Sequence, residues 1–239
     1  MKDLPLKSSF LIILIIFVAC AGCSTQKTMT SSGDSGQGSS PKVPFSGSSP
    51  GGSFPPVGSS VNESQIRSDN FSWVEYKHTD SNKGITTDST YHIEGAPGDY
   101  GGQPAYHSKT TITKADGSVR IDDVYWDSSK KDTLGGTMTI TSGGHTTVTP
   151  IQPYKRPVGG TEFEESIPFT FEGIEAVTVP YGTYAAAGKY IKQFTPPGSS
   201  DVITETDWVV PGIAPPLKYI QYHGTDKNTY SMNELKAWG

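Results

Sequence analysis

The chain has 239 residues, of which 33% are hydrophobic and 18% charged, and its formal net charge is −5. This mild acidity argues against a nucleic-acid partner, because phosphate contacts need clustered Lys and Arg. No stretch reaches the roughly 18 apolar residues of a spanning helix, which excludes a polytopic membrane protein. Cys20 and Cys23 are the only cysteines, so the rest of the chain has neither a disulfide nor a cysteine nucleophile.

The first 22 residues have the pattern of a secretory signal. A basic start with Lys2 and Lys7 leads into the apolar run Phe10–Val18, and small residues follow up to Gly22. This order of a charged, an apolar and a small-residue region is typical of signal peptides. Because no twin-Arg pair is present, the pattern favours export by the general route.

The end of this signal carries a lipidation pattern. Ala21-Gly22-Cys23-Ser24 resembles the box that lipoprotein signal peptidases cleave, in which the cysteine thiol takes the lipid and becomes the first residue. The match departs from the family at Cys20, where a Leu or similar residue is usual, and Cys20 itself is the alternative lipidation site. We therefore expect a lipoprotein held by its N-terminal lipid at the outer face of the cytoplasmic membrane or at the cell surface. The other interpretation is an unlipidated secretory signal or a short N-terminal anchor.

Residues 23–62 are predicted to form a disordered tether. About two thirds of positions 24–60 are Ser, Gly or Pro, a composition that cannot bury enough apolar surface to offset the entropy of ordering. As a flexible coil, such a segment spans about 30–40 Å. Asn62 and Asn70 each begin an N-glycosylation sequon near its end, so both are candidate modification sites in an exported chain. Such a tether suits a cell with one membrane and an outer coat, of which an archaeon is an example.

Residues 63–239 are predicted to fold as one β-rich domain. Extended runs rich in Thr, Val, Ile and Tyr alternate with turn signals such as Asp116-Gly117 and Gly143-Gly144, as expected for hairpins. Ten runs are predicted as strands, at 71–79, 85–94, 107–114, 119–127, 137–141, 145–151, 183–194, 202–210, 217–223 and 229–238. Short helices are predicted only at 63–68 and 162–167. The hairpin-length connections make the sheet an antiparallel meander.

Some of the last strands are apolar on both faces. In Val202–Val210, Trp208 and Val210 oppose Ile203 and Val209. A strand that is apolar on both sides is covered twice or lines a cavity as well as a core, and a curved sheet offers both situations. The fold class that we expect is therefore mainly β, as a strongly bent antiparallel sheet or an incomplete β-barrel.

The C-terminal part resembles a family of envelope proteins. Val177-Thr-Val-Pro-Tyr-Gly-Thr-Tyr184 is similar to a hairpin of uncharacterised proteins related to the lipoprotein carriers and receptors LolA and LolB. Trp208–Ile213 with Leu217–Ile220, and the closing strand Tyr230–Lys236, are similar to that family's later strands. The resemblance covers about the last 65 residues. It departs at Ala214-Pro215-Pro216, which replaces a short glycine turn, and in the lack of clear helices to plug the concave face. The resemblance implies a bent sheet whose apolar concave side takes acyl chains.

Aromatic side chains gather in the C-terminal strands and are the candidate lining of a ligand pocket. The candidates are Tyr184, Tyr190, Trp208, Tyr219 and Tyr222. Such rings either form the core and rim of the sheet or line a pocket for a lipid or glycan. The function predicted first is binding of an apolar ligand or a lipidated partner in the concave face. The alternative is a structural or adhesive surface protein with a fully packed β-sandwich and no ligand.

No group of residues predicts catalysis or a cofactor. The five histidines are expected at surface or turn positions, and the pair His92 and Glu94 is too small a ligand set for zinc. Asp122, Asp123 and Asp127 are expected on a solvated edge, since general acid–base chemistry needs facing carboxylates with separated pKa values. We therefore predict neither a metal site nor an enzymatic activity. The oligomeric state is left open.

Overall fold

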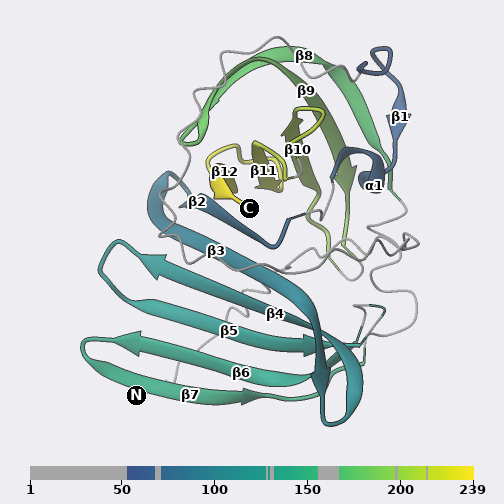
Figure 1. Ribbon diagram of the computed structural model, residues 1–239. Coiled ribbons are helices and arrows are strands. Elements are labelled where there is room, and N and C mark those ends of the chain that lie inside the picture. Colours follow the sequence, from purple (N-terminus) through teal and green to yellow (C-terminus); the bar gives the residue numbers. More distant parts are fainter. Residues whose placement is uncertain are drawn as a thin grey trace, which may run out of the picture.

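The computed structural model describes residues 53–67, 71–127, 129, 132–155, 167–196, 199–213 and 215–239. Within these ranges the chain forms one antiparallel sheet of twelve strands and one helix of a single turn. The strands lie in the order β1-β8-β9-β10-β11-β12-β2-β3-β4-β5-β6-β7 (Figure 1). Since β1 and β7 are the two edges of this order, the sheet is bent but not closed into a barrel.

One half of the sheet, which we call the curl, bends until its outermost strands face its central ones. It comprises β1 (Ser60–Val61), α1 (Glu63–Ile66), β8 (Phe169–Val179), β9 (Gly182–Phe194), β10 (Ile203–Val209), β11 (Lys218–His223), β12 (Tyr230–Trp238) and β2 (Trp73–Asn82). In Figure 1, β8 and β9 arc over β10, β11 and β12. At the tip of that hairpin, the Tyr181 N–H donates a hydrogen bond of 2.9 Å to the carbonyl of Leu235 in β12.

The bend of β8 has a local cause in its sequence. Its register against β9 shifts twice, between Phe171 and Gly173 and between Glu175 and Val177. The first shift leaves one extra residue on β8 and the second leaves one on β9, and an extra residue of this kind forms a β-bulge that bends the strand. Gly173 lies at φ 145°, a backbone conformation that glycine reaches without steric cost. The bulges therefore turn a long strand into an arc.

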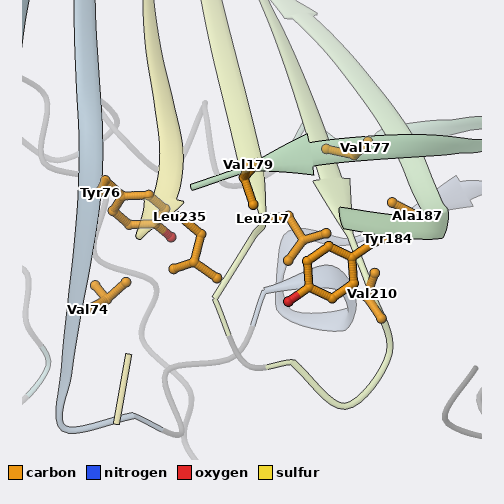
Figure 2. Packing of buried hydrophobic residues seen from close by; sticks show 9 residues of the cluster. All are labelled: Val74, Tyr76, Val177, Val179, Tyr184, Ala187, Val210, Leu217 and Leu235. Carbon is orange, nitrogen blue, oxygen red and sulfur yellow. The ribbon is translucent and has the colours of Figure 1, made fainter. Parts of the chain in front are cut away.

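The core of the curl consists of two clusters of apolar side chains on its inner face. Figure 2 shows the first, made of Val74, Tyr76, Val177, Val179, Tyr184, Ala187, Val210, Leu217 and Leu235. The second contains Ile66, Phe169, Phe171, Tyr190 and Val209. Phe169, Leu217 and Leu235 are 0% exposed, and burying each such side chain contributes about 1.5–3 kcal/mol.

The other half of the sheet, which we call the wing, is a series of hairpins. It consists of β3 (Ile85–Tyr100), β4 (Gln103–Lys114), β5 (Val119–Trp126), β6 (Thr133–Ser142) and β7 (His145–Ile151). Two-residue turns join several of these strands, and Gly143 and Gly144 between β6 and β7 lie at φ 57° and 78°. These positive angles fit the twist of a tight hairpin. The wing lies below the curl in Figure 1.

The prediction of a mainly β, strongly bent antiparallel sheet is confirmed. The ten predicted strands are present, and the structure adds β1 and β8 and lengthens β3 to Tyr100. The helix predicted at 63–68 is present as α1, whereas residues 162–166 of the second lie outside the described residues. The twelve strands belong to one sheet, so the packed curl differs from a sandwich of two sheets.

Candidate functional site

The inner face of the curl holds a buried group of charged side chains, which we call the charge cluster. Its members are Glu63, Arg67, Lys192, Glu205 and Asp207. The alternation of β10 places Glu205 and Asp207 on the same face as the buried Val209, and both carboxylates are 0% exposed. Lys192 of β9 is the register partner of Glu205 and is 3% exposed. Two neighbouring strands thus bring three charges into the interior.

The helix α1 and the residue that follows it supply the other two charges. Glu63 and Arg67 lie one turn apart, and Arg67 Nη1 is 2.7 Å from Glu63 Oε1. Arg67 Nε donates a hydrogen bond of 2.6 Å to Asp207 Oδ2, and the same guanidinium pairs with Glu205. Lys192 Nζ lies 3.2 Å from Glu63 Oε2 and 3.5 Å from Glu205 Oε2. The two cations therefore bridge three carboxylates from two distant parts of the chain.

Aromatic and amide groups enclose the charge cluster. Gln221 of β11 donates from Nε2 to Glu205 Oε2 over 3.0 Å. The centre of the Phe169 ring is 4.6 Å from Lys192 Nζ, and that of the Tyr219 ring is 5.5 Å from Arg67 Cζ. Cations over aromatic faces are attracted by the ring quadrupole. In such surroundings of low dielectric constant, the ion pairs are stronger than in water, and so is the penalty for an unpaired charge.

The electrostatic balance of the cluster is uneven. Burial raises the pKa of Asp207 to about 7, against the pull of Arg67 and with the help of the neighbouring Glu205 charge. Burial also opposes ionisation of Glu205, but Arg67 and Lys192 hold its pKa below the usual value. Asp207 Oδ1 is buried and has no hydrogen-bond partner. The surroundings thus favour ionisation of Glu205 and oppose ionisation of Asp207.

The arrangement is suited to fastening α1 to the sheet. Among the residues that the structure describes, no three His, Cys, Asp or Glu side chains are placed to hold a metal ion. Buried ion pairs add little net stability over an apolar core, but removing one partner is costly. The geometry therefore fixes where α1 sits on the inner face of β9 and β10.

Three of the predicted pocket aromatics lie on the inner face of the curl. Tyr184 belongs to the first apolar cluster and Tyr190 to the second. Tyr219 lies between the charge cluster and β2, with its ring 5.5 Å from Arg67 Cζ and edge-on to Tyr76 at 5.6 Å. Burial raises the pKa of Tyr184 to about 12. These three rings are packing partners of the core and of Arg67.

The other two predicted aromatics lie on the opposite face. Strand alternation separates Trp208 from Asp207, and Tyr222 from Tyr219. Trp208 Nε1 donates to Glu175 Oε1, and its ring packs at the rim of the first apolar cluster. The Tyr222 ring centre lies 4.4 Å from Lys227 Nζ. The structure therefore does not bring the five predicted rings together on one face.

The predicted modification sites are largely beyond the described residues. Cys23, Cys20 and Asn70 lie outside them. Asn62 is exposed directly before α1, where its N–H donates a hydrogen bond of 2.9 Å to Gln65 Oε1.

Two predictions about polar side chains are wrong. His78 is 6% exposed rather than at the surface, because its ring stacks on Tyr91 at 4.1 Å and its Nδ1 lies 2.9 Å from Asn233 Oδ1. Asp122 is also 6% exposed, since β5 lies between β4 and β6 and Arg120 Nε donates to Asp122 Oδ1 over 2.9 Å. A solvated edge therefore does not describe Asp122.

Sequence reasoning missed the charge cluster, although a signal for it exists. Lys192 shares a strand face with the apolar Tyr190 and Phe194, and all three are buried. Glu205 and Asp207 likewise lie between apolar positions of their own strand. Charges at core-facing positions require partners, so the alternation alone indicates an interior ion-pair network in β9 and β10.

The outer hairpin of the wing forms a second notable surface. Residues 133–151, which make up β6, β7 and their turn, contain no Asp, Glu, Lys or Arg. Ile140 and Val148 are 40% and 59% exposed. In the described part of the chain, β7 pairs only with β6, which leaves one side of its backbone open for pairing. This uncharged edge is suited to contact with another surface.

Comparisons with known proteins are sparse. No family model matches the chain, and no curated protein gives a significant match. A crystal structure of a presumed exported protein with a YmcC-like fold from Bacteroides fragilis is 14% identical, covers 73% of this chain and 98% of its own, and has a TM-score of 0.35. A presumed lipoprotein from Parabacteroides distasonis is 15% identical, with coverages of 73% and 97% and a TM-score of 0.34. At TM-scores below 0.5, neither likeness carries an argument for this chain. None of the helical residues described forms a helix long and apolar enough to cross a membrane.

Proposed function

We propose that this chain is an extracytoplasmic lipoprotein, anchored through a lipidated Cys23, with a structural or adhesive role and without enzymatic activity. The observation that supports this role best is the filled interior of the curl. Two apolar clusters and the charge cluster occupy its inner face. An adhesive function then rests on the outside of the molecule, where the uncharged hairpin β6–β7 offers a broad contact surface.

An apolar ligand in the concave face is the weaker candidate for a physical reason. An acyl chain at that position would have to displace α1 and Arg67 from Glu205 and Asp207, both of which are 0% exposed. Asp207 would lose the cation that it pairs with and Glu205 would keep only Lys192, and removing one partner of a buried ion pair costs several kcal/mol. The burial of an acyl chain would have to exceed that cost before binding became favourable.

The anchoring is tested with matched cysteine variants of the full chain. We expect Cys23→Ser to move the protein from the membrane fraction to the soluble exported fraction, because the thiol that takes the lipid is gone. Cys20→Ser should remain at the membrane, and the mass of its mature N-terminus should show a lipid on Cys23. Membrane retention of the Cys23→Ser protein would contradict anchoring through this residue.

The adhesive role is tested on the wing. Val148→Glu places a charge on the uncharged hairpin and should reduce attachment of cells that display the chain. Ile85→Glu is the matched control, since Ile85 is 76% exposed at the tip of the β2–β3 hairpin and lies outside this surface. Equal attachment by the wild type and both variants would contradict the role. Saturable binding of a fluorescent fatty acid to purified Cys23→Ser protein would favour the apolar-ligand function instead.

A further inference from the structure

The segment Ser53–Arg67, which we call the strap, lies along the β8 edge of the curl. Its strand β1 pairs with β8 at only two positions, Ser60 with Thr170 and Val61 with Phe169. The Gly58 N–H donates to the Phe171 carbonyl over 2.8 Å, and the Phe171 N–H donates to Ser59 over 2.9 Å. The backbone attachment of the strap is therefore short.

Side chains provide most of the remaining attachment. The Phe54 ring stacks on Phe171 with centres 5.9 Å apart, and Ile66 is 6% exposed within the second apolar cluster. Arg67 ends the strap and reaches Glu205 and Asp207 in β10. The strength of this last contact depends on the charge state of the carboxyls that receive the guanidinium.

The groups around Asp207 do not balance one another in charge. The titratable groups that face it are Glu63 and Arg67 from the strap, Tyr190 and Lys192 from β9, Glu205 from β10, Tyr219 from β11 and Tyr76 from β2. With the tyrosines neutral, three carboxylates face two cations. Full ionisation would leave one uncompensated negative charge in a closed interior, and Asp207 Oδ1 has no donor to stabilise it.

We propose that the strap is a proton-operated latch: it is closed when Asp207 carries a proton and the charge cluster is neutral, and it loosens when Asp207 ionises. Loosening separates β1 and α1 from β8 and β9 and frees the edge of β8. The step is an exchange of one proton between the Asp207 carboxyl and water, so no other reactant takes part.

The direction of the pH effect follows from the two states of the strap. In the closed state the pKa of Asp207 is about 7, raised by burial from the ordinary 3.8. An open strap exposes Asp207 to water, where its pKa is lower, so opening releases a proton. The proton's contribution to closure is therefore complete below the ordinary pKa of 3.8, is lost as the pH rises from there to about 7, and changes no further above that value. Glu205, whose pKa is lowered, stays ionised in both states over this range, so it adds no proton exchange of its own to the opening.

The test is hydrogen–deuterium exchange of the full chain at about pH 5.5 and about pH 8, corrected for the intrinsic exchange rate. Amides of Gly58 and Phe171 report the strap, because their hydrogen bonds join it to β8, and the amide of Arg67, which donates to the Glu63 carbonyl, reports whether α1 stays formed. We expect their protection to be about tenfold higher at the acidic pH, as one linked proton permits. Amides of the β4–β5 hairpin should show no such change. Equal protection at both pH values, or lower protection in acid, would overturn the latch.

A pair of isosteric variants assigns the effect to one carboxyl. Asp207→Asn should remove the pH dependence of strap protection, whereas Asp201→Asn, at an exposed position before β10, should retain it. Retention of the wild-type pH dependence by Asp207→Asn would refute the assignment. If that variant does not fold, the wild-type comparison of strap and wing amides still decides whether the latch exists.

Discussion

The curl and the wing belong to one sheet, yet they bury their side chains in different ways. In the curl, the bend brings a second layer of side chains onto the inner face, and Phe169, Leu217 and Leu235 lose all contact with water. In the wing, Ile140 and Val148 remain 40% and 59% exposed. The inner strands of the wing still bury Ile112 and Val124, whereas its outer hairpin keeps apolar side chains in contact with water, because it lacks the opposing layer that the bend supplies in the curl.

The ion pairs of the two halves also differ in burial: those of the curl are enclosed and those of the wing are open to solvent. Lys192 and Glu205 in the curl have side chains 1% and 0% exposed. Lys109 and Glu94 in the wing lie 3.7 Å apart with side chains 40% and 46% exposed. Solvent screens the second pair and leaves it worth about 0–1 kcal/mol, whereas the buried network is sensitive to the loss of any member.

The largest effect is expected from Arg67→Met. This change leaves Glu205 and Asp207 buried without their guanidinium, which should lower the free energy of unfolding by about 3–5 kcal/mol. Urea unfolding followed by circular dichroism measures the loss. Lys109→Met in the wing is the control and should cost no more than about 1 kcal/mol. If both variants lost a similar free energy of unfolding, the ion pairs of the curl and the wing would not differ in strength as we expect.

The next effect concerns the apolar interior. Leu235→Ala opens a cavity in the first apolar cluster and should cost about 2–5 kcal/mol in unfolding free energy. Val148→Ala, at an exposed position of β7, should stay within about 0.5 kcal/mol of the wild type. A small effect of Leu235→Ala would mean that the curl is not packed as described.

A smaller effect is expected where the strap meets the curl. A Cβ at Gly188 would lie 2.7 Å from Phe54 and 2.9 Å from Tyr190, so Gly188→Ala should cost about 1–3 kcal/mol through overpacking. Its strap amides should also exchange faster. Gly182→Ala is the control, because its Cβ would make only ordinary contact with Tyr184 at 3.8 Å. If the strap amides of Gly188→Ala exchanged hydrogen at the wild-type rate, the contact between Phe54 and Gly188 would be contradicted.

The hairpins of the wing were predictable because their signals are local. Gly117 of Asp116-Gly117 and both residues of Gly143-Gly144 supply the positive φ angles of tight turns, and alternating residues flank them. The strand β8 was harder to predict from periodicity, since the bulges at Phe171/Gly173 and Glu175/Val177 break its alternation. The division into curl and wing depends on how far the sheet bends. The degree of bending cannot be predicted from a short stretch of sequence.

The charge cluster was only half predictable. The positions of Lys192, Glu205 and Asp207 on core-facing sides follow from alternation, so a need for partners could have been read there. Their partner Arg67 lies 138 residues before Glu205 in the chain, just after a segment whose composition indicates disorder. Only the fold shows that Arg67 is the cation that pairs with these carboxylates, because it is the fold that brings the strap onto β9 and β10.

The position of Arg67 also has a mechanical consequence. The edge strand β1 belongs to the strap, and its two-residue pairing with β8 would separate easily under tension. The guanidinium, however, is attached two strands further in, at β10. A pulling force on the N-terminal side of the chain meets β1 first, because β1 precedes Arg67 in the chain. Once β1 has separated, the Arg67 guanidinium transmits the force to β10 and holds α1 on the sheet, which limits the peeling to the first strand.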